Sequence, residues 1–64
     1  MKVKYDKEID ILYITLSDEK IEESDEEKNG FILDYSKNGS LVGIEILNAS
    51  KSSINPAKVE YEVA

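Results

Sequence analysis

The chain has 64 residues and a formal net charge of −6, and it contains neither cysteine nor histidine. Disulfides and zinc sites built from Cys and His are therefore excluded as means of stabilising so small a core. The excess of carboxylates argues against binding nucleic acid through its phosphates, and no apolar run approaches the roughly 18 residues of a membrane span. We expect a single cytoplasmic domain over residues 1–64, without a cofactor.

The first two predicted strands, at about residues 2–5 and 11–16, form a hairpin. The second is the densest run of β-branched, aromatic and aliphatic side chains in the sequence. Its two faces carry, respectively, Leu12, Ile14 and Leu16, and Ile11, Tyr13 and Thr15. Because neither face is fully polar, this strand needs cover on both sides.

Between these strands, Asp6 and Asp10 suit the polar connection. An aspartate side chain can accept the backbone N–H two residues further on, as in an Asx turn. We expect Asp6 to do so within the turn and Asp10 to do so where the second strand begins.

Residues 17–29 are strongly acidic and contain a single large apolar residue, Ile21. Such a segment cannot bury one face as an amphipathic helix. The composition predicts a mobile loop or a short edge strand around residues 21–23, either of which would keep sheet edges from associating. A cation- or partner-binding arm is the functional alternative, although the segment lacks the calcium-loop pattern.

A second hairpin is predicted from residues 31–36 and 41–47. Asn38-Gly39 between two alternating apolar runs favours a two-residue type I′ turn. In that register facing residue numbers sum to 77, so Asp34 opposes Gly43 and Tyr35 opposes Val42. A glycine within a strand indicates a bulge or the close approach of another backbone, for which a covering helix and a second subunit are the candidates.

The C-terminal part predicts a short helix over residues 49–54, with Asn48 as its N-cap. Valine and tyrosine alternate with glutamate over residues 58–63, which is typical of an edge strand and leaves open whether it pairs within the chain or with a partner. The fold class is mainly β within α+β: an antiparallel meander of four core strands, a short helix and this possible fifth strand.

Three segments together resemble the domain-of-unknown-function family 2283, a family of short prokaryotic proteins. They are Tyr5-Asp6 with Asp10-Ile11-Leu12-Tyr13-Ile14, then residues 30–35 (GFILDY), then residues 43–50 (GIEILNAS). The resemblance covers about residues 3–50. Family members often carry aspartate at the positions of Ser36 and Asn48, so a carboxylate role at those positions would be lost here. The resemblance implies no established activity; the occurrence of members beside genes for small toxin-like proteins implies an antitoxin-like role.

Without histidine or cysteine, catalysis would depend on carboxylates, lysines, tyrosines and hydroxyls. The candidate group is Asp6, Asp10, Asp34 and Glu45. The predicted register places Glu45 diagonal to Asp34 on one face, about 7–8 Å apart at the α-carbons. Two such carboxylates could share a proton or hold a divalent cation, or they could be ordinary surface charges. We assign no catalytic residue.

A protein-binding role has broader support from the sequence. Self-association, most simply as a homodimer, would enlarge the small core, and the acidic surface suits a basic protein partner. The residues predicted for the interface are Ile11, Tyr13, Leu41, Gly43 and Leu47. The alternative is a divalent-cation-binding protein or a carboxylate-based enzyme that uses Asp34 and Glu45.

Overall fold

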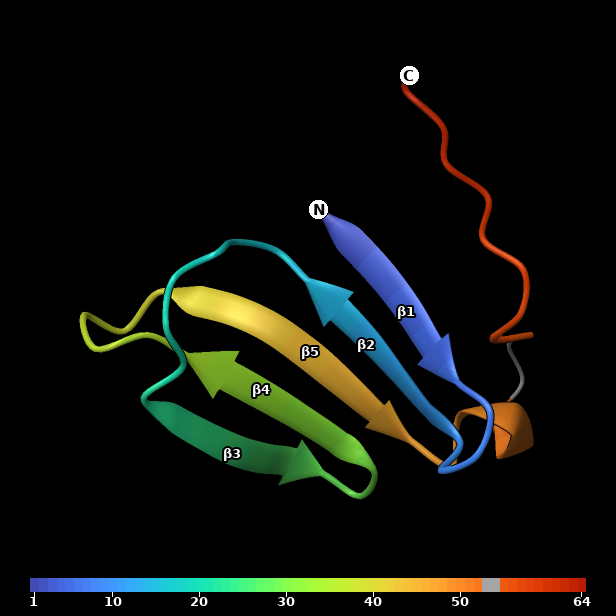
Figure 1. The fold of residues 1–64 in the computed structure, drawn as a ribbon, viewed down its shortest axis with the longest axis horizontal. Coiled ribbons are helices and arrows are strands. Elements are labelled where there is room, and N and C mark those ends of the chain that lie inside the picture. The colour runs from blue at the N-terminus through green and yellow to red at the C-terminus, as the bar shows by residue number, and fades with distance from the viewer. Residues whose placement is uncertain (53–54) are drawn as a thin grey trace.

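A computed structural model, which describes residues 1–52 and 55–64, shows one antiparallel sheet of five strands (Figure 1). The strands are β1 (Lys2–Asp6), β2 (Ile11–Thr15), β3 (Glu23–Lys28), β4 (Phe31–Tyr35) and β5 (Leu41–Leu47). A short 3-10 turn, η1 (Ala49–Lys51), follows β5. The mainly β, antiparallel class predicted from the sequence is confirmed.

The strand order across the sheet is β1-β2-β5-β4-β3. Strands β3, β4 and β5 follow one another as a meander, while β5 inserts beside β2. The segment between β2 and β3 therefore crosses the end of the sheet, where the Leu16 and Ser17 N–H groups both donate to the Val42 carbonyl, at 2.7 and 3.2 Å. The edges of the sheet are β1 and β3.

Strand β3 lies within the acidic segment and pairs with β4 along one side only. All six of its residues are exposed. Of the two sequence expectations, the edge strand is correct, but it covers residues 23–28 rather than 21–23. A strand can form here without burying side chains because the backbone hydrogen bonds to β4 hold it.

The hairpin of β4 and β5 has the predicted register over most of its length, since Asp34 opposes Gly43 and Phe31 opposes Ile46. The turn itself is different. Gly39 has a φ of 84°, Asn38 is not among the positive-φ residues, and the Gly39 N–H donates to the Ser36 carbonyl at 3.0 Å. This is a type I turn in a three-residue loop, not a type I′ turn.

A bulge compensates for the longer loop. Tyr35 opposes Leu41 rather than Val42, so that Val42 is the additional residue in β5. Beyond this bulge the register returns to the sum of 77 that the simpler turn predicts.

The C-terminal part departs most from the sequence expectation. The predicted helix over residues 49–54 is a 3-10 turn at Ala49–Lys51, and its residues 53 and 54 lie outside the described residues. Asn48 precedes the turn in the left-handed region, with a φ of 51°, and makes no side-chain capping hydrogen bond. The predicted strand at 58–63 is not formed, and Figure 1 shows this segment extending away without joining the sheet.

The core of this sheet is thin. Buried apolar residues are Leu12, Val42 and Ala49, and among the described residues no large side chain is fully buried. None of the elements that the structure describes lies across the sheet in the face-on view of Figure 1. Within residues 1–52 and 55–64, no helix is long or apolar enough to cross a bilayer.

Candidate functional site

Cross-strand pairing sorts the side chains into two faces of different chemistry. The face that we call the apolar face carries Val3, Tyr5, Leu12, Ile14, Phe31, Leu33, Ile44 and Ile46, and at the β3 edge it carries Asp25 and Lys28. The face that we call the mixed face carries Lys2, Lys4, Asp6, Ile11, Tyr13, Thr15, Ser24, Glu26, Ile32, Asp34, Gly43, Glu45 and Leu47. Hydrophobic side chains thus form two complete rows across four strands on one face only.

The structure places most of the predicted interface residues on the mixed face. Ile11, Tyr13 and Leu47 are half-buried there, while Leu41 at the start of β5 is exposed. Carboxyl groups occupy the middle of this face, whereas the two rows of the apolar face carry none in β1, β2, β5 and β4 and reach a carboxyl group at Asp25 on the β3 edge. The apolar face is therefore the better candidate for a surface that another molecule covers.

Gly43 lies close against the backbone of the neighbouring strand β2. A Cβ atom at this position would lie 2.9 Å from the Ile14 carbonyl oxygen of β2 and 3.8 Å from Asp34 Oδ2. The close approach expected at this glycine is real, but the approaching backbone is β2 of the same chain, not a covering helix or a second subunit.

Asp34 and Glu45 are neighbours on the mixed face, as predicted. Asp34 is 4% exposed, and its Oδ1 accepts a 2.6 Å hydrogen bond from Ser24 Oγ of β3. Burial, followed by the hydrogen bond and the negative charge of Asp34, raises the pKa of Glu45. Two carboxyl groups so close favour retention of one proton between them.

The raised pKa of Glu45 predicts a pH-dependent stability. Such a group stabilises the fold fully below its unfolded pKa of about 4.3, and this stabilisation is lost as the pH rises through its folded pKa. Glu45→Gln should therefore increase the free energy of unfolding at pH 7, because the amide can donate to Asp34 without carrying charge. The increase should vanish near pH 4.

Chemical denaturation between pH 4 and pH 8 measures this effect. The control is Glu27→Gln, which removes the same charge from an exposed position in β3. Equal effects of the two substitutions would show that only net charge matters.

Asp10 forms a second polar cluster at the other end of the sheet, where β1 turns into β2. Its Oδ1 accepts hydrogen bonds from Tyr5 Oη at 2.7 Å and from the Ser50 N–H at 2.9 Å, and its Oδ2 accepts one from Ser50 Oγ at 2.7 Å. The Ala49 N–H also donates to the Asp10 carbonyl at 3.0 Å. Asp10 thus attaches η1 to the first hairpin.

The four candidate carboxylates do not form one site. Asp6 accepts the Glu8 N–H at 3.1 Å, which confirms its predicted Asx turn. Pairing across the sheet sets Asp34 of β4 in one row with Gly43 of β5, Thr15 of β2 and Lys2 of β1. Asp6 lies four residues further along β1 than Lys2. Asp34 and Asp6 are therefore three strand spacings of about 4.8 Å apart across the sheet and four residues apart along it. Ser24 and Ser50, which complete the two clusters, were not identified from the sequence because serine by itself carries no signal.

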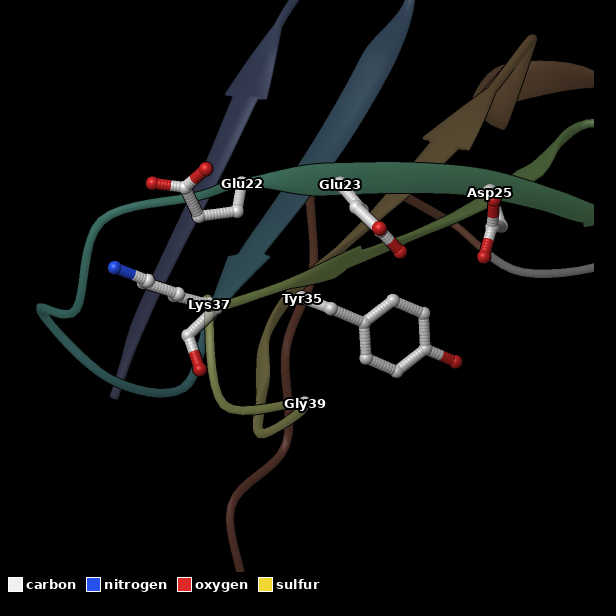
Figure 2. A pocket seen from close by; sticks show the side chains of 7 residues that line it. Glu22, Glu23, Asp25, Tyr35, Lys37 and Gly39 are labelled. Carbon is white, nitrogen blue, oxygen red and sulfur yellow. The ribbon is translucent and has the colours of Figure 1, made fainter.

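An open hollow of about 450 Å³ lies at the β3 edge. Figure 2 shows the side chains of Glu23, Asp25 and Tyr35 on the same side of β3 and β4. Neither Asp34 nor Glu45 lines this hollow. Across the described residues, no three acidic side chains gather closely enough to hold a metal ion.

The family model for the protein of unknown function (DUF2283) matches residues 2–50. The match spans all five strands and the first two residues of η1, so it includes Tyr5, Asp10 and Ser50 as well as Asp34, Gly43 and Glu45. No curated protein and no solved structure gives a significant match. Because the family model covers most of the 64 residues, the chain belongs to the family of proteins of unknown function DUF2283.

Proposed function

We propose that this protein is a self-association module in which a second copy covers the apolar face. The supporting observation is the two rows of hydrophobic side chains that the chain leaves only partly covered. Phe31 and Val3 remain 44% and 40% exposed, while Ile14, Ile44 and Ile46 in the centre are half-buried. Packing two such sheets face to face would build a shared core about 10 Å thick.

The physical reason is the size of the core. Burial of apolar surface contributes roughly 25 cal/mol per Å², and a chain this short must offset the conformational entropy of every ordered residue. Covering the apolar face with a copy of itself removes apolar surface from water twice, once on each subunit. Twofold symmetry is the commonest way for a protein to achieve this.

The test is sedimentation equilibrium of the full chain and of Phe31→Asp. Because Phe31 is already half-exposed, the substitution should leave the monomer folded while placing a charge within the interface. We expect a dimer for the wild type and a dissociation constant at least about tenfold higher for the variant.

Thr15→Asp is the matched control, since it adds the same charge to an exposed position on the mixed face. Circular dichroism of both variants separates loss of association from loss of folding. A wild-type chain that sediments as a monomer at micromolar concentration would contradict the proposal.

A basic protein partner is the second candidate, and strand β3 is the observation that favours it. Its four acidic residues and one lysine are all exposed, and its outer edge offers unpaired backbone groups. An extended basic segment could add there through main-chain hydrogen bonds, with electrostatic attraction increasing the association rate.

The two candidates differ in their dependence on salt. Binding of a basic partner to β3 should weaken as the ionic strength rises, because exposed charges are screened. Self-association through the apolar face should persist at high salt. Titration of a lysine-rich peptide into the labelled chain at low and high salt measures the affinity for a basic partner and its dependence on salt.

A further inference from the structure

The outer edge of β1 and the C-terminal residues 58–63 both lack a partner strand in the part of the chain that the structure describes. Strand β1 is an end strand of the sheet, so the backbone groups on its outer side have no ladder. Val59, Tyr61 and Val63 are 62%, 78% and 79% exposed. The described chain therefore leaves an alternating apolar segment in water.

The two segments are complementary when they are aligned antiparallel with Tyr61 opposite Val3. The facing pairs are Lys58 with Asp6, Val59 with Tyr5, Glu60 with Lys4, Tyr61 with Val3, Glu62 with Lys2 and Val63 with Met1. Every pair is either apolar with apolar or acidic with basic, and such cross-strand pairs stabilise a sheet. A parallel alignment with Val59 opposite Val3 would instead set Glu62 against Asp6 and Lys58 against Lys2.

The added strand would also continue both faces of the sheet. Val59 and Tyr61 would extend the apolar face beyond β1, and Glu60 and Glu62 would lie beside the lysines of the mixed face. The opposite edge is unsuitable, because β3 is acidic and would repel these glutamates. Charge and hydrophobicity thus select β1 as the docking edge.

We propose that residues 58–63 of one copy add as a strand to β1 of a second copy, and that the exchange is reciprocal. This proposal rests on the proposed self-association and names the segment that takes part in it. In the single chain these residues do not join the sheet (Figure 1). Their Lys58–Glu60 ion pair, at 3.3 Å, joins two side chains that are 68% and 82% exposed, and such a surface pair offers little resistance to exchange.

Charge reversal in the full chain tests the exchange. Glu60→Lys with Glu62→Lys should weaken dimerisation by roughly tenfold, because each new lysine faces Lys4 or Lys2. Adding Lys2→Glu and Lys4→Glu to the same chain should restore the wild-type dissociation constant. The control is Glu19→Lys with Glu27→Lys, which changes the net charge equally at exposed positions away from β1.

Sedimentation equilibrium separates the two proposals. A wild-type dimer that the Glu60 and Glu62 reversals weaken no more than the control does would contradict the exchange and leave self-association intact. A wild-type monomer would contradict self-association itself.

Cysteine pairing distinguishes exchange between copies from pairing within one chain, and the sequence contains no other cysteine to interfere. Lys4→Cys with Glu60→Cys places two thiols on facing positions, within the α-carbon spacing of about 4.4–6.8 Å that a disulfide requires. We expect a disulfide-linked dimer under mild oxidation. The control, Lys4→Cys with Tyr61→Cys, directs the thiols to opposite faces and should not link. An intramolecular disulfide in the first variant, or none, would overturn the proposal.

Discussion

Gly43→Ala is expected to lower the free energy of unfolding by about 1–3 kcal/mol, the usual cost of inserting a methyl group where there is no space. The new Cβ would lie 2.9 Å from the Ile14 carbonyl oxygen, which belongs to the backbone of a central strand and cannot move aside as a flexible side chain would. To relieve the contact, β2 and β5 must separate locally, which strains the ladder that joins the first hairpin to the rest of the sheet.

Thermal or urea denaturation at one fixed protein concentration measures this loss, since association would make the midpoint depend on concentration. In a domain of this size, each kcal/mol corresponds to a shift in Tm of roughly 4–8 °C. Gly39→Asn is the control. Gly39 has no atom near its missing Cβ, and asparagine tolerates its positive φ of 84°. If the Gly43 variant were as stable as the Gly39 variant, close contact between β2 and β5 would not constrain the fold.

Asp10→Asn is expected to lower the Tm at pH 7 by several degrees. Asparagine accepts the left-handed backbone at this position, where φ is 56°, so the substitution removes the charge and leaves the chain path unchanged. What is lost is charge-assisted hydrogen bonding from Tyr5 and Ser50, which holds η1 against the first hairpin. Hydrogen bonds to an ionised acceptor are the stronger ones.

The effect of Asp10→Asn should depend on pH with a definite sign. Hydrogen bonds from Ser50 and then Tyr5 lower the pKa of Asp10. A group with a lowered folded pKa stabilises the protein above its unfolded pKa of about 3.9, and this stabilisation is lost as the pH falls through the folded value. The difference between wild type and variant should therefore be constant from pH 7 to about pH 5 and should shrink below about pH 4.

Ser50→Ala provides the matching comparison, because it removes a donor and leaves the carboxylate in place. Ser50→Ala and Asp10→Asn both weaken the hydrogen bonding between Asp10 and Ser50. The double variant should therefore lose less free energy of unfolding than the sum of the two single losses. Additive losses would show that Asp10 acts independently of η1.

The opposite pKa shifts of Asp10 and Glu45 give the protein two responses to acid. As the pH falls through the raised pKa of Glu45, protonation of Glu45 stabilises the fold, and protonation of acidic side chains also reduces the repulsion of a chain with a net charge of −6. At lower pH the contribution of Asp10 is lost. The two clusters lie at different places in the sheet, so their single substitutions should not interact.

Much of the hairpin geometry was predictable because it depends on neighbouring residues. Alternation along each strand assigned Leu12 and Ile14 to one face and Ile11 and Tyr13 to the other, as the pairing shows. The register that sets Asp34 opposite Gly43 was also correct, and with it the proximity of Asp34 to Glu45. The loop differs from the predicted one, yet the bulge at Val42 returns the strands to the same register.

Strand β3 and the C-terminal segment show where strand prediction from the local sequence pattern fails. The acidic residues 23–28 have no apolar alternation, but pairing with β4 is enough to make them a strand. Residues 58–63 have the alternation of a strand, but in the described chain they have no partner. A segment forms a strand only where a neighbouring strand offers it backbone hydrogen bonds, and the presence of that neighbour is not a property of the segment itself.

The sequence by itself determined the antiparallel β class, the positions of four strands and, away from the turn, the facing residues of the hairpin formed by β4 and β5. Side chains alternate every second residue, and a short turn restricts the register. Only the tertiary structure decided that β5 lies between β2 and β4, that Asp10 binds Ser50 forty residues further along the chain, and that Gly43 faces the backbone of β2. These contacts join segments that are distant in sequence, and they depend on the free energy of the whole sheet rather than on the preference of any single segment.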